Sequence, residues 1–241
     1  MCSLILSFVP AATWPLVIAA NRDERLDRPW DPPGRFWPGV IAGRDRLAGG
    51  TWLGVNQHGV IAAVLNRTAS LGPAPGKSSR GDLPLIALRG RTAAAAADHI
   101  VALNAGSYRG FNMLIADATG GFLIRGLESG APEAASVAPG ITMITAGDPN
   151  DAANPRIARY KPRFEAAPRP DPSTNDWSDW TALLADQTPP AETSLNVAPH
   201  DGFGTVSSCL VALAPEATLF QFAAGPPDRT AFMPVSLEPW P

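Results

Sequence analysis

Residues 1–8 read MCSLILSF, and residues 15–24 read PLVIAANRDE. Each stretch contains an apolar run of strand length, and Pro10 and Pro15 lie between the two runs, so the pattern predicts a β-hairpin rather than one long helix. With a turn centred near residues 11 and 12, antiparallel pairing places Cys2 opposite Asn21. We therefore expect the thiol of Cys2 beside Asn21, Arg22 and Asp23.

The polar residues 21–24 end the second apolar run abruptly. Packing alone explains them poorly, because a buried charge costs several kcal/mol unless it is paired. Cys2 has two interpretations. Composition alone favours a small, inert hydrophobic residue. Removal of Met1, expected because the next side chain is small, would instead leave a thiol (pKa about 8.5) and an α-amine (about 7.7 to 8.0), which can serve as nucleophile and base.

Length and composition describe an ordinary soluble protein. The 241 residues, 45% hydrophobic and 17% charged, predict one domain spanning residues 1–241. A net charge of -3 with scattered Lys and Arg gives no electrostatic footprint for nucleic acid or anionic lipid, so neither is an expected partner. The two cysteines form no CxxC or metal-ligand spacing, which predicts a reducing compartment and no metal site.

The apolar start also resembles a targeting segment. No positive region precedes residues 4–20, two prolines interrupt them, and charged residues follow at once, so we expect neither a cleaved leader nor a membrane span. The sequence therefore predicts a cytoplasmic protein. It does not determine the oligomeric state.

Apolar alternation and turn residues predict further elements along the chain. Strands are expected at residues 49–55, 60–65, 110–116, 121–125, 141–145, 205–213, 218–224 and 230–235. Helices are expected from Asp82, at residues 93–103 after a Thr92 cap, at 154–164 ending at Pro162, and at 177–185. Residues 25–39, rich in Arg, Pro and Trp, predict an irregular loop. This order indicates an α+β protein with mainly antiparallel sheet.

Asn66 follows the predicted strand of residues 60–65. The amide of an Asn at a strand end can donate to a developing oxyanion, a role worth about 3 kcal/mol. The alternative, an Asn that ends the strand by bonding its own backbone, is favoured by the sequence alone. The motifs GxGxxG, GxxxxGK[ST], HExxH and GxSxG are absent, which excludes the usual signatures of dinucleotide, P-loop, zinc-protease and α/β-hydrolase sites.

Several motifs occur together in a fixed order. They are Met1-Cys2, the run LVIAANRDE at 16–24 with Arg28-Pro29, GGTWLG at 49–54, the strand at 59–66, SRG at 79–81, GFN at 110–112 with Leu114, and Gly204-Thr205. In this order and spacing the sequence resembles the Asn-Arg-Asp-Glu (NRDE) family, also called the transport and Golgi organisation protein 2 family. The resemblance covers nearly the full length.

That family is in turn similar to the N-terminal-nucleophile hydrolases, above all the choloylglycine hydrolase and penicillin acylase relatives. The resemblance implies a four-layer αββα sandwich, in which two antiparallel sheets lie between helix layers. It also implies roles for individual residues. Cys2 would be the nucleophile, Asn21 and Asp23 would position it, and Asn66 would donate to the oxyanion. As candidate substrate contacts we expect Arg22, Trp52 and Asp148.

Two positions depart from the pattern that the resemblance implies. Val206 follows Gly204-Thr205 where relatives commonly have an arginine, and Asp148 stands where an Asn is expected. An ionised Asp accepts hydrogen bonds and donates none, unlike the amide of Asn. Arg156 and Arg159 are the candidates to replace the missing arginine.

Two functions follow from these residues and the resemblance. In the first, Cys2 attacks an amide or acyl thioester as an N-terminal-nucleophile hydrolase or acyltransferase that needs no cofactor. In the second, which the resemblance implies, the protein binds and carries haem or an acyl-coenzyme A or other lipid without turnover. The sequence has no CxxCH motif, but His58, His99 and His200 are compatible with haem as a partner.

Overall fold

The computed structural model describes residues 2–238 and 240, so Met1 lies outside the described residues. The chain forms two compact units. The first unit comprises residues 1–28 and 138–236, and the second comprises residues 29–137 and 237–241. Each unit is built on one sheet of antiparallel strands.

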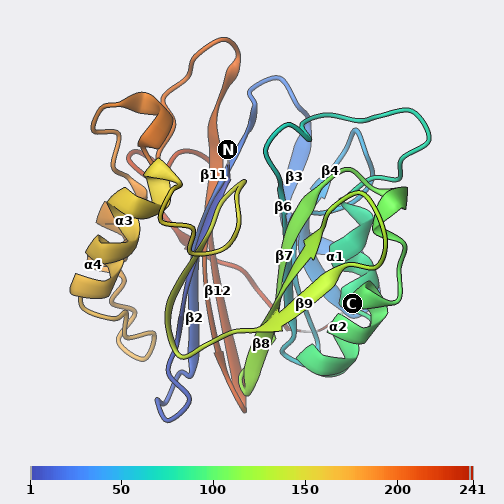
Figure 1. Cartoon of the computed structure of the whole chain (residues 1–241). Coiled ribbons are helices and arrows are strands. Elements are labelled where there is room, and N and C mark those ends of the chain that lie inside the picture. The colour runs from blue at the N-terminus through green and yellow to red at the C-terminus, as the bar shows by residue number, and fades with distance from the viewer. Residues whose placement is uncertain (1, 239, 241) are drawn as a thin grey trace. The chain divides into compact units, whose positions relative to one another are not determined.

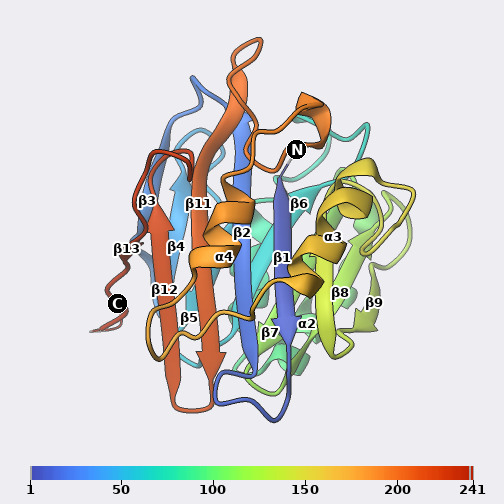
Figure 2. The same cartoon turned by 90° about the vertical axis from the view of Figure 1, so that its left-hand side faces the viewer.

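The sheet of the first unit has, in the described part of the chain, six strands in the order β10-β1-β2-β11-β12-β13. Figure 2 shows β1, β2, β11 and β12 side by side, with α3 and α4 crossing one face of their sheet. The strands are β1 (Ser3–Phe8), β2 (Leu16–Arg25), β10 (Gly140–Ile144), β11 (Phe203–Ala214), β12 (Ala217–Ala223) and β13 (Met233–Pro234). The predicted hairpin at the start of the chain is therefore confirmed as β1 and β2, which lie inside this sheet.

The helices of the first unit are α3 (Pro155–Ala166) and α4 (Ser178–Leu184), with a short 3-10 turn, η2 (Ala191–Thr193). Alternate residues of β2, Val17 and Ala19, pack into one core cluster with Ile157 of α3 and Trp180 of α4. Because side chains alternate across a strand, the same face of β2 continues with Asn21 and then Asp23. The apolar end of β2 thus packs against the helices. The polar side chains of Asn21 and Asp23 lie on the same face of the sheet as these helices.

The register of the hairpin differs by one residue from the prediction. Ser3, not Cys2, lies opposite Asn21. The N–H of Val9 donates to the carbonyl of Pro15 at 2.8 Å, which closes a turn centred on Ala12. The later centre of this turn shifts every pair of the ladder by one residue, because hairpin register is fixed by the turn.

The sheet of the second unit runs in sequence order from β3 to β9. Figure 1 shows α1 and α2 lying along the strands of this unit. The strands are β3 (Trp30–Trp37), β4 (Val40–Asp45), β5 (Leu53–Asn56), β6 (Ile61–Asn66), β7 (Phe111–Asp117), β8 (Gly120–Gly126) and β9 (Glu133–Ser136), and the helical segments are α1 (Asp82–Ala87), α2 (Ala93–Val101) and η1 (Ala105–Ser107). Thr92 caps α2 as predicted, because its side chain accepts from the N–H of Ala95 at 3.2 Å.

Three predictions about local structure are wrong. Residues 30–37 form strand β3 rather than a loop; this strand lies at the edge of its sheet, where the missing N–H groups of Pro32 and Pro33 are tolerated. Strands β4 and β9 were not predicted, and β13 covers only residues 233–234. Pro162 lies inside α3 instead of ending it, because the Asn154 cap and the buried faces of Tyr160 and Phe164 outweigh one lost hydrogen bond.

Within the residues that the structure describes, no helix is both long enough and apolar enough to cross a membrane.

Candidate active site

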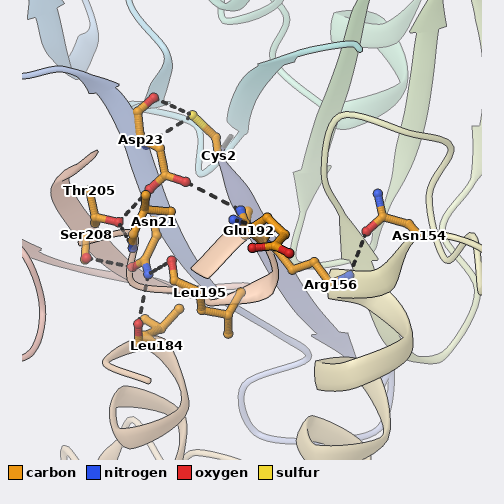
Figure 3. A network of polar contacts seen from close by, with 12 residues as sticks. Cys2, Asn21, Asp23, Asn154, Arg156, Leu184, Glu192, Leu195, Thr205 and Ser208 are labelled. Atoms are coloured by element: carbon orange, nitrogen blue, oxygen red, sulfur yellow. Dashed lines mark hydrogen bonds and ion pairs between the residues drawn. The ribbon is translucent and has the colours of Figure 1, made fainter. Parts of the chain in front are cut away.

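Cys2 immediately precedes β1, and its thiol lies against the backbone of the neighbouring strand β2. The N–H of Asp23 donates to Sγ at 3.4 Å, and Sγ donates to the carbonyl of Asp23 at 3.5 Å (Figure 3). Cys2 is half-buried. The hairpin therefore places the thiol beside Asp23, as the sequence predicted, and holds it through backbone groups.

The carboxylate of Asp23 is fully buried, with 0% of its side chain exposed. One oxygen, Oδ1, accepts from Thr205 Oγ1 at 2.6 Å, and the other, Oδ2, lies 3.5 Å from Arg156 Nη1. Thr205 is opposite Asp23 on β11. The buried carboxylate thus has both a hydrogen-bond donor and a cationic partner, which a charge in the protein interior requires.

Arg156 reaches this carboxylate from the first turn of α3. Asn154 caps the helix, since its side chain accepts from the N–H groups of Arg156 at 3.0 Å and Ile157 at 3.2 Å. The guanidinium also donates to Ser3 Oγ at 3.1 Å and to the carbonyl of Glu192 at 3.4 Å. Figure 3 shows Arg156 beside Glu192 and Asp23. Only 7% of the Arg156 side chain is exposed. The helix cap and the loop carbonyl together fix the direction of this side chain.

Arg159, the other candidate to replace the missing arginine, lies on the same helix. Its Nη1 donates to Thr193 Oγ1 at 2.8 Å and to the carbonyl of Pro189 at 3.2 Å. These contacts hold the segment around η2 against α3. Of the two arginines, Arg156 is the one that contacts the Asp23 carboxylate.

Asn21 is buried beneath the same end of β2. Its Nδ2 donates to the carbonyls of Leu184 and Leu195, both at 2.9 Å, and its Oδ1 accepts from Ser208 Oγ at 2.7 Å. Both amide hydrogens are therefore used within the fold. Asn21 ties β2 to the end of α4 and to the segment that follows η2, so it stabilises the strand that carries Asp23.

Arg22 is largely buried, and its Nη2 lies 3.7 Å from Glu24 Oε2. Across the sheet it is opposite Ser207, and the register between β2 and β11 shifts between Thr205 and Ser207. Val206, 9% exposed, is the extra residue of this β-bulge. The bulge at the position of the missing arginine is what aligns Thr205 with Asp23.

The thiol of Cys2 is not activated by its surroundings alone. Burial raises the pKa of the Cys2 thiol, and the Asp23 carboxylate raises it further. The charge of the N-terminal amine, the hydrogen bond from the Asp23 backbone and the charge of Arg22 lower this pKa. In a chain that retains Met1, the nitrogen of Cys2 belongs to a peptide bond and cannot take a proton. A base must come from elsewhere.

The remaining predicted site residues lie in other places. Asp148 is half-buried in the loop between β10 and α3 of the first unit. Asn66 is the last residue of β6, in the second unit, opposite Phe111.

Trp52 also belongs to the second unit, just before β5. Its ring meets Trp30 edge to face at 5.9 Å and covers Gly43, where an added Cβ would lie 2.3 Å from the ring. The structure thus brings Cys2, Asn21, Arg22 and Asp23 together in the first unit.

Sequence reasoning missed three hydroxyl groups of this network, those of Ser3, Thr205 and Ser208. Thr205 carried a signal, because it belongs to the Gly204-Thr205 motif. Ser3 and Ser208 carried none, since a serine in a strand has many ordinary positions.

The sequence and the fold were compared with those of known proteins. Residues 1–220 match the family described as Transport and Golgi organisation 2. The chain belongs to this family. Curated members from Bos taurus and Homo sapiens, both named Transport and Golgi organization protein 2 homolog, are 32% and 31% identical to it over 129 residues. Each match covers 48% of this chain and 45% of the relative, so the chain spans about half the length of the curated relatives it matches.

Three solved structures that are similar to this Transport and Golgi organisation 2 family member bear the names of enzymes. An N-acylethanolamine-hydrolyzing acid amidase ortholog from Caenorhabditis elegans has a TM-score of 0.61 at 12% identity, over 90% of this chain and 98% of that one. Penicillin V acylase from Agrobacterium tumefaciens has a TM-score of 0.60 at 12% identity, over 92% of this chain and 83% of that one. The C2A mutant of conjugated bile acid hydrolase from Clostridium perfringens has a TM-score of 0.53 at 11% identity, over 99% of this chain and 97% of that one.

At such low identity these similarities establish the fold alone. They confirm the predicted class, an α+β fold of the N-terminal-nucleophile hydrolase type with two antiparallel sheets. The predicted similarity between the Transport and Golgi organisation 2 family and these hydrolases is thus confirmed for the fold of this chain.

Proposed function

We propose that this protein is a cysteine N-terminal-nucleophile hydrolase or acyltransferase that acts on an amide or an acyl thioester. The observation that carries the proposal is the contact of the Cys2 thiol with Asp23, at the start of a chain with the hydrolase fold. The three structural neighbours are named as an acid amidase, an acylase and a conjugated bile acid hydrolase, which supports an acyl substrate.

The first step requires removal of Met1, which turns the nitrogen of Cys2 into an α-amine. With a pKa of about 7.7 to 8.0, that amine is partly neutral at physiological pH and takes the thiol proton. The thiolate attacks the substrate carbonyl, so that an S–C bond forms and the carbonyl oxygen becomes an oxyanion. The N–H of Asp23, which donates to Sγ at 3.4 Å, favours the thiolate before the attack.

The second step releases the leaving group. The C–N or C–S bond of the substrate breaks, and the α-ammonium gives its proton to the departing amine or thiolate. A water molecule, or an acceptor amine in acyl transfer, then attacks the acyl thioester on Cys2. The α-amine takes the proton of the attacking group, and the bond between the acyl carbon and Sγ breaks to release the carboxylic acid or the new amide. The proton then passes to Sγ, which restores the thiol.

The other predicted residues have proposed roles that follow from their chemistry. Asn66 donates its amide N–H to the oxyanion. Asp23 and Asn21 position the end of β2 beside Cys2, an interpretation supported by their buried hydrogen bonds. Arg22, Trp52 and Asp148 are proposed to contact the substrate. The partner is thus a small acyl compound.

A panel of amides and acyl thioesters tests the proposal. It includes an N-acylethanolamine, penicillin V, a conjugated bile acid and acyl-coenzyme A esters of several chain lengths. The wild-type protein should release the acyl group from at least one compound, and Cys2→Ala should lose that activity.

Cys209→Ala is the matched control. It removes the second thiol, which is 5% exposed in β11, and should leave the rate within about twofold. Turnover that survives in Cys2→Ala would reject the proposal, and so would a wild-type protein without activity after verified loss of Met1.

The carrier of haem or of an acyl-coenzyme A or other lipid is the second candidate. An axial histidine for haem has to face an enclosed apolar pocket. His58, His99 and His200 are exposed, so the histidines do not fit that requirement. Saturable haemin binding that survives Cys2→Ala, without acyl transfer, would favour the carrier.

We propose the cytoplasm as the compartment, since both cysteines are free thiols.

A further inference from the structure

A continuous set of buried polar contacts joins α3 to the Cys2 thiol. Arg156 Nη1 lies 3.5 Å from Asp23 Oδ2, and the backbone N–H of Asp23 donates to Cys2 Sγ at 3.4 Å. The same Nη1 donates to Ser3 Oγ at 3.1 Å, on the residue that follows Cys2. Arg156 therefore contacts both strands beside the thiol, β1 through Ser3 and β2 through Asp23. Figure 3 shows the contact with Asp23.

The positive charge of the chain's N-terminal amine favours the thiolate of Cys2. The side-chain charges around the thiol come from two elements. On β2, Asp23 and Arg22 act on Cys2 directly, and Glu24 is paired with Arg22. From α3, Arg156 faces the Asp23 carboxylate. A carboxylate near a thiol disfavours the thiolate, and a cation next to that carboxylate offsets its charge. Because the Asp23 and Arg156 side chains are buried, salt and water screen this effect only weakly.

We infer that Arg156 is a positioning residue of the Cys2 site: it holds Ser3 and Asp23 around the thiol and offsets the carboxylate charge that a thiolate would meet. Its importance for catalysis rests on the proposed function. Its effect on the thiol does not, because a thiol reacts with an alkylating agent whether or not the protein has a substrate.

The test is the rate at which iodoacetamide alkylates Cys2 as a function of pH, in a Cys209→Ala background with one thiol. In Arg156→Gln the guanidinium beside the Asp23 carboxylate is lost, so the midpoint of the rate profile should move to higher pH. A shift of one pKa unit lowers the thiolate fraction tenfold, and we expect the rate at pH 7.5 to fall about tenfold.

Arg159→Gln is the matched control. It removes an arginine from the same helix that also binds the η2 segment, through Thr193, but contacts the loop instead of Asp23. Its profile should stay within about twofold of the parent at every pH. Thermal unfolding of each variant separates a change in the site from a loss of the fold.

Asp23→Asn keeps the inference testable if Arg156→Gln fails to fold, which is a risk because that change removes a cation from beside a buried carboxylate. Removing the carboxylate while Arg156 remains should move the midpoint to lower pH. An unshifted profile in Arg156→Gln, an equal shift in Arg159→Gln, or a midpoint that does not fall in Asp23→Asn would overturn the inference. A shift in Arg156→Gln in a protein that no substrate acylates would leave the inference standing and reject the proposed function.

Discussion

Cys2 and Cys209 belong to the same unit and differ in their neighbours. Burial raises the thiol pKa of both, so burial alone does not distinguish them. Cys209 lies in β11 opposite Phe222 and Ala20, and burial raises its thiol pKa to about 12. Burial raises the pKa of Cys2 as well. The difference is the neighbours: Cys2 lies against Asp23, whose carboxylate is bound by Thr205 and Arg156.

The comparison shows that neither thiol becomes a nucleophile through burial. A raised pKa lowers the fraction of thiolate, so reactivity at neutral pH requires a base close to the sulfur. Cys2 can obtain that base from its own nitrogen once Met1 is removed, and Cys209, in the middle of a strand, cannot.

An N-terminal extension should have the largest effect. When a cleavable leader is fused in front of Cys2, the nitrogen of Cys2 stays in a peptide bond, and no amine is available to take the thiol proton. Acyl release should then be at least about a thousandfold slower than after the leader is cut off immediately before Cys2. The measurement is the rate before and after cleavage, with cleaved Cys2→Ala as the control. An extended form as active as the cleaved one would show that another group is the base.

Asn66→Ala should have the next largest effect. If its amide donates to the oxyanion, its removal should lower kcat by about a hundredfold to a thousandfold and change KM little. Steady-state kinetics with the best substrate provides the check. Asn104→Ala, at the 3-10 turn η1 of the same unit, is the control and should leave kcat within about twofold. A large rise in KM with kcat unchanged would instead make Asn66 a substrate contact.

Asn21→Ala should lower the stability of the fold. The substitution removes three buried hydrogen bonds and leaves the carbonyls of Leu184 and Leu195 without this donor. We expect the free energy of unfolding to fall by about 3 kcal/mol, against about 1 kcal/mol for Ser208→Ala, which removes only one of these bonds. Urea unfolding of both variants measures the difference. Equal losses would mean that the two carbonyl contacts contribute little.

Cys209→Ala should have the smallest effect, confined to alkaline pH. The pKa of Cys209 is raised in the folded state, so above about pH 8.5 the unfolded state loses its thiol proton first and is favoured. Between pH 8 and pH 10 this difference should lower the stability of the parent protein by about 1 to 2 kcal/mol relative to Cys209→Ala. Unfolding curves at the two pH values test it, and parallel losses in both proteins would contradict it.

Much of the fold followed from short-range patterns. The hairpin of β1 and β2 was predictable because two apolar runs flank prolines, and the cap of α2 because Thr92 precedes an alanine-rich run. Strand β3 was not, since Pro32 and Pro33 argue against a strand until its position at the sheet edge is known. The one-residue error in the register came from the geometry of a turn that the sequence does not specify.

The contacts of the site also fall into those that local sequence predicts and those that depend on the tertiary fold. The contact of Cys2 with Asp23 was predictable because both lie in one hairpin. The choice between Arg156 and Arg159 was not, because it depends on where α3 docks on the sheet, 133 residues along the chain from Asp23. The bonds of Asn21 are equally non-local, since Leu184 and Leu195 are 163 and 174 residues away in sequence. Local chemistry identified the candidate residues, and tertiary contacts decided their partners.

The most direct test of Cys2 as an N-terminal nucleophile is the intact mass of the protein before and after incubation with an acyl substrate. The account predicts a chain without Met1 that gains the mass of one acyl group, located by peptide mapping on Cys2 and absent in Cys2→Ala. A chain that retains Met1 and gains no acyl group on Cys2 would contradict it.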